Sequence, residues 1–165
     1  MTTNGSKYVV AIFAILAAYF VYQWWFNDNR IIKRQLGELA AALSARENET
    51  QIERIARLAK VRRFVDDSAR VTLGTTEYSR DEAIGVAAAW QLPPGGWNLD
   101  FADVDVRVGS DDSARAFATA EMTTRDVQTS QPQSLGSVEV TFSLAKRRGE
   151  WLITRADVKR TATTP

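Results

Sequence analysis

The stretch VEVTFSL (138–144) alternates between apolar and polar residues, with the apolar ones at even-numbered positions. A period of two is typical of a β-strand that has one face against a core and the other in solvent. The short connection Arg147-Arg148-Gly149 leads into a second such stretch, residues 151–158. These residues predict an antiparallel hairpin near the C-terminus.

Further strands are expected upstream of this hairpin. Residues 101–108 and 114–127 also alternate, and the segment between them, Gly109-Ser110-Asp111-Asp112, is a turn sequence. Every second residue from Ala114 to Ala120 is alanine, which predicts a strand with one face tightly covered. The polar residues 128–136 are expected to form a loop, so the chain ends in an antiparallel meander.

The residues before these strands have helical periodicity. Apolar residues recur at helical spacing over 29–45, and Thr50 with Glu53 matches a capping box that opens a second helix, running to about residue 64. That helix carries an apolar stripe made of Ile52, Ile55, Ala56 and Ala59. The two helices are expected to form a hairpin.

A short strand and a third helix complete the pattern. Residues 69–73 have the β-branched content of a strand, and the Gly74-Thr75-Thr76 turn follows them. Ser79 with Glu82 matches a second capping box, which opens a helix over 80–91 that ends at Pro93-Pro94-Gly95-Gly96. The order helix, helix, short strand, helix, strands predicts an α+β domain.

Two segments and this order of elements resemble the nuclear transport factor 2-like superfamily. FVDDSARV (64–71) joins the second helix to the first strand, and GEWLI (149–153) opens the last strand. The resemblance covers residues 30–160 and implies a cone at 27–160, in which a curved antiparallel sheet packs on about three helices. Enzymes of the superfamily place acidic, tyrosine or histidine side chains inside this cone, and the carboxylates here do not match those positions. Residues 161–165 are expected to be a polar tail.

The composition argues against several classes of function. The 165-residue chain has no cysteine and no histidine, which removes thiolate chemistry and the usual general base near neutral pH. Its net charge of +1 does not point to nucleic acid, although residues 27–63 are basic and the residues after them acidic. We therefore expect no catalytic residue, no metal, no cofactor and no nucleic-acid partner.

Residues 8–26 form an uncharged and mainly apolar run after a tail at residues 1–7. A helix of that length would cross the roughly 30 Å of hydrocarbon in a bilayer. Aromatic residues at the two ends are expected to lie at the membrane interface, namely Tyr8, Tyr22, Trp24 and Trp25. A cleaved signal peptide is the alternative, but the basic region is thin and no Ala-x-Ala site precedes the aromatic residues.

These features predict a single-pass protein of the bacterial inner (plasma) membrane with a transmembrane helix at 8–26. The side of the membrane stays open at this point. The few positive charges lean toward a cytoplasmic domain, whereas the resemblance to anchored relatives favours a periplasmic one.

Four residues are candidates for a pocket inside the cone: Tyr78, Trp90, Glu121 and Arg155. Aromatic side chains suit apolar ligands, and a polar group inside the cone would orient them. Arg155 would share a strand face with Trp151 and Ile153 if strict alternation holds. The alternatives are core or partner contacts for the aromatic residues and an ion pair near the sheet edge for the charged ones.

The second helix is basic, and Trp97 lies on a constrained loop that suits a protein contact. Anionic lipid headgroups or an acidic partner would be contacted by Arg54, Arg57, Lys60, Arg62, Arg63 and Trp97. The alternatives are a solvated helix face for the basic residues and insertion into the core for Trp97.

Three functions fit the sequence. The favoured one is a non-catalytic, membrane-anchored accessory subunit that docks on a larger membrane protein complex, respiratory, photosynthetic or transport, and stabilises it. The second is a cone at the membrane surface that binds, or acts on, a small apolar ligand. The third is a homodimer through the open sheet face, with close approach at Ala114 to Ala120. The partners expected are therefore membrane lipids, other membrane protein subunits and a second copy of the chain.

Overall fold

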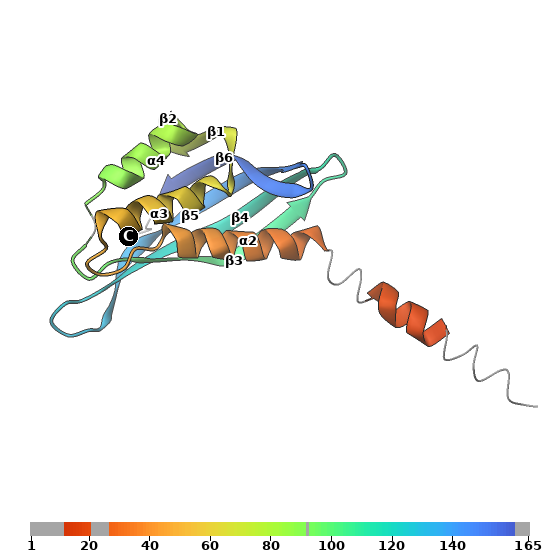
Figure 1. Cartoon of the computed structure of the whole chain (residues 1–165), viewed down its shortest axis with the longest axis horizontal. Coiled ribbons are helices and arrows are strands. Elements are labelled where there is room, and N and C mark those ends of the chain that lie inside the picture. The colour runs from red at the N-terminus through yellow and green to blue at the C-terminus, as the bar shows by residue number, and fades with distance from the viewer. Residues whose placement is uncertain (1–11, 21–26, 92, 161–165) are drawn as a thin grey trace, which may run out of the picture.

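The computed structural model describes residues 12–20, 27–91 and 93–160 of the chain. Helices α2, α3 and α4 lie on one side of a curved six-stranded sheet (Figure 1). Residues 12–20 are also helical. The prediction of an α+β domain is confirmed.

Each of the three helices begins after a capping residue. In α2 (Asp28–Leu43) the N-cap Asn27 accepts a hydrogen bond from the backbone of Asn29. Both predicted capping boxes form, Thr50 with Glu53 at the start of α3 (Gln51–Arg62) and Ser79 with Glu82 at the start of α4 (Arg80–Ala89).

The sheet is mixed, which corrects the prediction of a purely antiparallel one. Its strand order is β2-β1-β6-β5-β4-β3, and only the β1–β6 pair is parallel. Alternation in a sequence shows which face a side chain takes but not the direction of the neighbouring strand. The strands are β1 (Val65–Leu73), β2 (Thr76–Ser79), β3 (Asn98–Val108), β4 (Ser113–Arg125), β5 (Pro132–Arg147) and β6 (Glu150–Arg160).

The core lies between α2 and the inner face of the sheet. Ile32 and Leu36 of α2 are fully buried, and the alternate residues from Ala114 to Ala120 of β4 are buried as well. These small side chains leave room for the helix to pack closely on the strands. Because they are covered within the domain, they do not lie on the open face of the sheet, where the homodimer hypothesis requires them.

The N-terminal end of α2 is fastened to the β5–β6 hairpin by one carboxylate. The Oδ1 atom of Asp28 accepts hydrogen bonds from the indole Nε1 of Trp151 and the Nζ of Lys146, each at 3.0 Å. The Lys146 ammonium also lies 5.5 Å from the centre of the Trp151 ring. This cluster holds the first turn of the helix against the sheet.

Among the described residues, no helix is both long and apolar enough to cross a membrane. The localisation of the chain to the inner membrane as a single-pass protein was therefore wrong. Residues 8–11 and 21–26 of the expected span lie outside the described residues, and with them Tyr8, Tyr22, Trp24 and Trp25.

Candidate functional site

A cavity of about 310 Å³ lies between the three helices and the inner face of the sheet. All three helices and all strands except β2 contribute to its walls, which include Leu39, Leu58, Ile84, Met122 and Phe142. Walls as apolar as these favour apolar molecules over water.

Helix α4 covers this cavity without filling it. Ala83, Ile84 and Ala87 of α4 line the cavity, yet none of the ten residues of the helix is fully buried. The alanine side chains are too short to reach the sheet, so open space remains beneath them. The helix is held at its ends instead, by its capping box and by polar contacts to its neighbours.

The walls offer almost no polar chemistry. Among the described residues that line the cavity, Arg80 is the only one with an ionisable side chain. Its guanidinium forms ion pairs with Asp67 and Asp81, whose side chains are largely exposed. Burial opposes the charge of Arg80, but the two carboxylates outweigh burial and raise its pKa. The positive charge of the guanidinium is therefore already balanced by carboxylates at the surface.

Two tryptophans close one part of the cavity. Trp90 and Trp97 both line it, with ring centres 4.9 Å apart and planes at 77°. The indole Nε1 of Trp97 is buried and has no acceptor among the described residues. The structure thus places Trp90, one of the predicted pocket residues, in the wall of this cavity together with Trp97.

The other predicted pocket residues lie elsewhere. Tyr78 is half-buried on β2 and does not line the cavity. Glu121 is exposed, because its neighbours Ala120 and Met122 take the inner face of β4.

Arg155 points away from the cavity because β6 contains a bulge. Ser143 pairs with Arg155 and Leu144 with Ile153, which leaves Thr154 unpaired. The extra residue shifts the alternation, so Ile153 and Ala156 face inward and Arg155 faces out. There it forms ion pairs with Glu77 at 3.0 Å and Asp157 at 3.1 Å, which is the structural alternative that the sequence left open.

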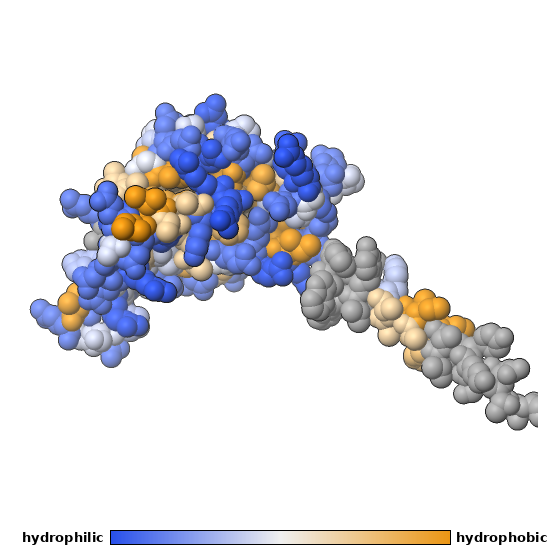
Figure 2. All heavy atoms as spheres, viewed as in Figure 1, coloured by the Kyte–Doolittle hydropathy of each residue, from blue (hydrophilic) through white to orange (hydrophobic). Residues whose placement is uncertain are grey.

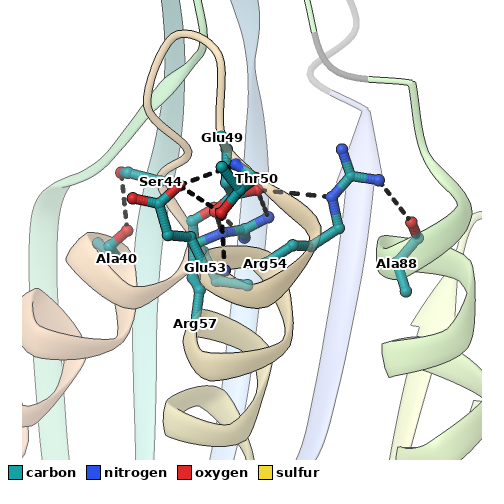
Figure 3. Close-up of polar contacts among 9 residues, drawn as sticks. Ala40, Ser44, Glu49, Thr50, Glu53, Arg54, Arg57 and Ala88 are labelled. Carbon is teal, nitrogen blue, oxygen red and sulfur yellow. Dashed lines mark hydrogen bonds and ion pairs between the residues drawn. The ribbon is translucent and has the colours of Figure 1, made fainter.

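Two of the basic residues of α3 tie helix ends together. Arg57 binds both carboxylate oxygens of Glu49, at 2.6 and 3.1 Å, and donates to the carbonyl of Leu43 at the end of α2 (Figure 3). Arg54 donates to the carbonyl of Ala88 near the end of α4, at 3.2 Å. These contacts give Arg54 and Arg57 a structural role.

The remaining basic residues are at the surface. Arg62 pairs with Asp81 of α4 at 3.2 Å. Lys60 and Arg63 are exposed and form no ion pair within the described parts of the chain. Of the proposed partner-contact residues, these two are the ones that the domain leaves available.

A second hollow, of about 640 Å³, lies beside the loop between α2 and α3. It is more open and its walls are a mixture of polar and apolar surface, with Arg46, Asn98 and Arg125 among the polar residues. Mixed surface of this kind is better solvated and favours an apolar ligand less than a predominantly apolar cavity does. The cavity under α4 is therefore the better candidate site.

No protein-family model matches the sequence, and no curated protein sequence matches it. Solved structures do match the fold. An NTF2-like protein with a cystatin-like fold from Novosphingobium aromaticivorans has a TM-score of 0.63 at 12% identity, over 88% of this chain and 90% of that one. The chain has a nuclear transport factor 2-like fold.

Other proteins with this NTF2-like fold differ in what they do. The association domain of CaMKII from Caenorhabditis elegans matches with a TM-score of 0.63 at 12% identity, over 81% of this chain and 95% of that one. A proposed scytalone dehydratase from Novosphingobium aromaticivorans matches with 0.59 at 12% identity, over 80% and 83%. The NTF2-like fold thus includes enzymes as well as association domains, and fold alone does not assign this chain to either.

Proposed function

We propose that this domain binds a small apolar molecule in the cavity under α4 and does not transform it. The observation that carries the proposal is a cavity of about 310 Å³ with predominantly apolar walls, at the low end of the range for ligand pockets of roughly 300–1,000 Å³. Removing apolar ligand surface from water would supply the binding energy, at about 25 cal/mol per Å². Selection would rest on size and shape.

The chemistry of the walls supports binding over catalysis. General acid–base catalysis needs a titratable group within hydrogen-bond reach of the reacting atom. Arg80, the one ionisable residue among the described residues of the wall, is paired with two carboxylates and stays charged at all ordinary pH values. A neutral ligand therefore suits this site better than a reacting substrate.

Filling the cavity tests the proposal. Binding of the neutral fluorescent dye Nile red to the full chain would be measured for the wild type and for Ala87→Phe, which places a ring into the space below α4. We expect the affinity to fall at least tenfold, with no loss of thermal stability because the ring fills a void.

The matched control is Ala89→Phe, which adds the same ring to an exposed alanine of the same helix. It should leave dye binding unchanged. Equal affinity of the wild type and Ala87→Phe would show that the dye binds elsewhere and would refute the cavity as the site.

A second candidate function is that of a non-catalytic subunit that docks on partner proteins. It is favoured by the large apolar side chains that α3 exposes, with Ile52 80% and Ile55 62% accessible. One solved structure of similar fold is itself an association domain, that of CaMKII. Copurification of the native chain tests this function, and a chain that always migrates alone as a monomer would argue against it.

A further inference from the structure

Helix α3 has two opposite apolar faces, and the domain covers only one of them. Leu58 and Val61 are buried on the inner face. At 100° per residue, the stripe of Ile52, Ile55, Ala56 and Ala59 lies on the opposite side, and all four side chains are exposed. The sequence pattern showed the stripe, but it does not contribute to the core.

The exposed stripe forms a patch within a charged surface. Figure 2 shows apolar side chains gathered over α3 and ringed by hydrophilic ones. Apolar patches that are rimmed by polar residues mark interaction sites. The patch does not belong to the cavity, since Ile52, Ile55, Ala56 and Ala59 are absent from its walls.

We propose that α3 pairs with α3 of a second copy of this chain, antiparallel, about a two-fold axis between Ile55 and Ala56. This assignment goes beyond ligand binding and does not depend on it. Under that symmetry Ile52 faces Ala59 of the other copy, whereas Ile55 and Ala56 each lie next to their own counterpart across the axis. Each Ile52 side chain then meets a small one, as ridges meet grooves in packed helices.

The charges beside the stripe fit the same arrangement. Glu53 and Lys60 lie seven residues apart on one flank of α3. An antiparallel two-fold pair keeps each flank on its own side, so Glu53 of each copy lies within one helical turn of Lys60 of the other. Lys60 forms no ion pair among the described residues, and Glu53 uses only its Oε2 atom there, in the capping box. The interface would thus gain two cross-helix ion pairs.

The size of the stripe sets the strength of the pair. A stable interface buries about 800 Å² on each partner, and one face of a twelve-residue helix supplies less than that. The dimer should therefore be reversible and dependent on protein concentration. Measurements must span a range of concentrations to detect it.

Because the chain has no cysteine, single introduced cysteines report directly on contacts between copies. Ala56→Cys lies next to the proposed axis, within disulfide reach of its own copy across the interface. Val127→Cys is the matched control, since Val127 is 63% exposed, like Ile55, but lies beyond β4, away from α3.

With mild oxidant, we expect the full-length Ala56→Cys protein to form a disulfide-linked dimer at least ten times faster than Val127→Cys. Equal rates would mean random collision, or association through another part of the chain. Either equal rates or an unlinked Ala56→Cys protein would overturn the proposal.

Sedimentation velocity of the full chain supplies a second, non-covalent readout. Ile55→Asp and Lys60→Glu should each weaken association at least tenfold, whereas Val127→Asp should not. Adding Glu53→Gln to Lys60→Glu should restore part of the loss, because glutamine preserves the capping box and removes the repulsion. If Ile55→Asp left the association constant unchanged, the proposed contact would be contradicted. Unchanged melting temperatures would confirm that the variants fold.

Discussion

At the scale of single residues, Gly95 is the described glycine at which an added Cβ atom would make the closest backbone contact. A Cβ atom added there would lie within the radius of the Arg125 carbonyl oxygen, which is backbone and cannot swing away. We predict that Gly95→Ala lowers the free energy of unfolding by about 3 kcal/mol, since the turn before β3 must move away from the end of β4 to admit the methyl group. Chemical denaturation measures the change.

The matched glycine is Gly37, in the interior of α2, where an added Cβ meets nothing within 4 Å. Gly37→Ala should raise the free energy of unfolding by about 0.5–1 kcal/mol, because alanine is the better helix former. If glycine-to-alanine lowers the free energy of unfolding at position 95 and raises it at position 37, the close backbone contact is the cause of the loss at Gly95. A neutral Gly95→Ala would contradict it.

Asp28 provides a pH-dependent contribution to stability. Its hydrogen bond from Trp151, followed by its contacts with Lys146, lowers the pKa of the carboxyl below its ordinary 3.8 despite partial burial. A lowered folded-state pKa stabilises the protein above pH 3.8, and this stabilisation is lost as the pH falls through the folded-state value. Asp28→Asn should therefore cost about 1 kcal/mol at neutral pH and almost nothing in strong acid.

The measurement is urea denaturation of both proteins between neutral pH and strong acid. Asp100→Asn serves as the control, since Asp100 is exposed on β3 and forms no ion pair among the described residues. A pH-independent difference between the wild type and Asp28→Asn would show that the carboxylate charge is not the cause.

At the scale of elements, the ends of α2 and α4 depend on contacts from α3. The Glu49 side chain is only 5% exposed, and Arg57 binds it through two nitrogen atoms while also capping α2. Arg57→Met would leave this carboxylate with only the longer contact to Arg54, so we expect a loss of about 3 kcal/mol. Arg62→Met removes an exposed ion pair with Asp81 and should cost less than about 1 kcal/mol. Thermal denaturation of both variants tests the difference.

Helix α4 should open more easily than α2. It buries no side chain completely, whereas α2 buries five residues in the core. Among α2, α3 and α4, amide hydrogen exchange should therefore be fastest in α4. Ser79→Ala removes the N-cap of α4 and should lower its opening free energy by about 1 kcal/mol, which accelerates exchange further. A ligand in the cavity should slow exchange in α4 specifically. Equal protection of α2 and α4 would contradict this account of the cavity roof.

At the scale of the whole molecule, local patterns predicted most elements. Clean alternation located the long strands, and two capping boxes located the starts of α3 and α4. The strand β2 was missed because four residues next to a turn carry little periodicity. The parallel direction of β1 was missed because it depends on the path of the chain between elements.

The candidate site was less accessible to sequence reasoning. Ile84, Ala87 and Met122 line the cavity, but an apolar residue beside a void has the same pattern as one in a filled core. Arg155 was placed inside the cone because one unpaired residue, Thr154, reverses the alternation. The exposed stripe on α3 was visible as periodicity, yet periodicity does not say whether the domain or another molecule covers it.

The position of the last strand also has a consequence for biosynthesis. Since β6 lies between β1 and β5, a growing polypeptide that has left the ribosome as far as β5 still has two unpaired edges facing each other across a gap. Unpaired edges recruit foreign strands, so the nascent protein would need protection until the final segment emerges. Folding of this domain is therefore expected to finish late in translation, with the closing step made by the residues synthesised last.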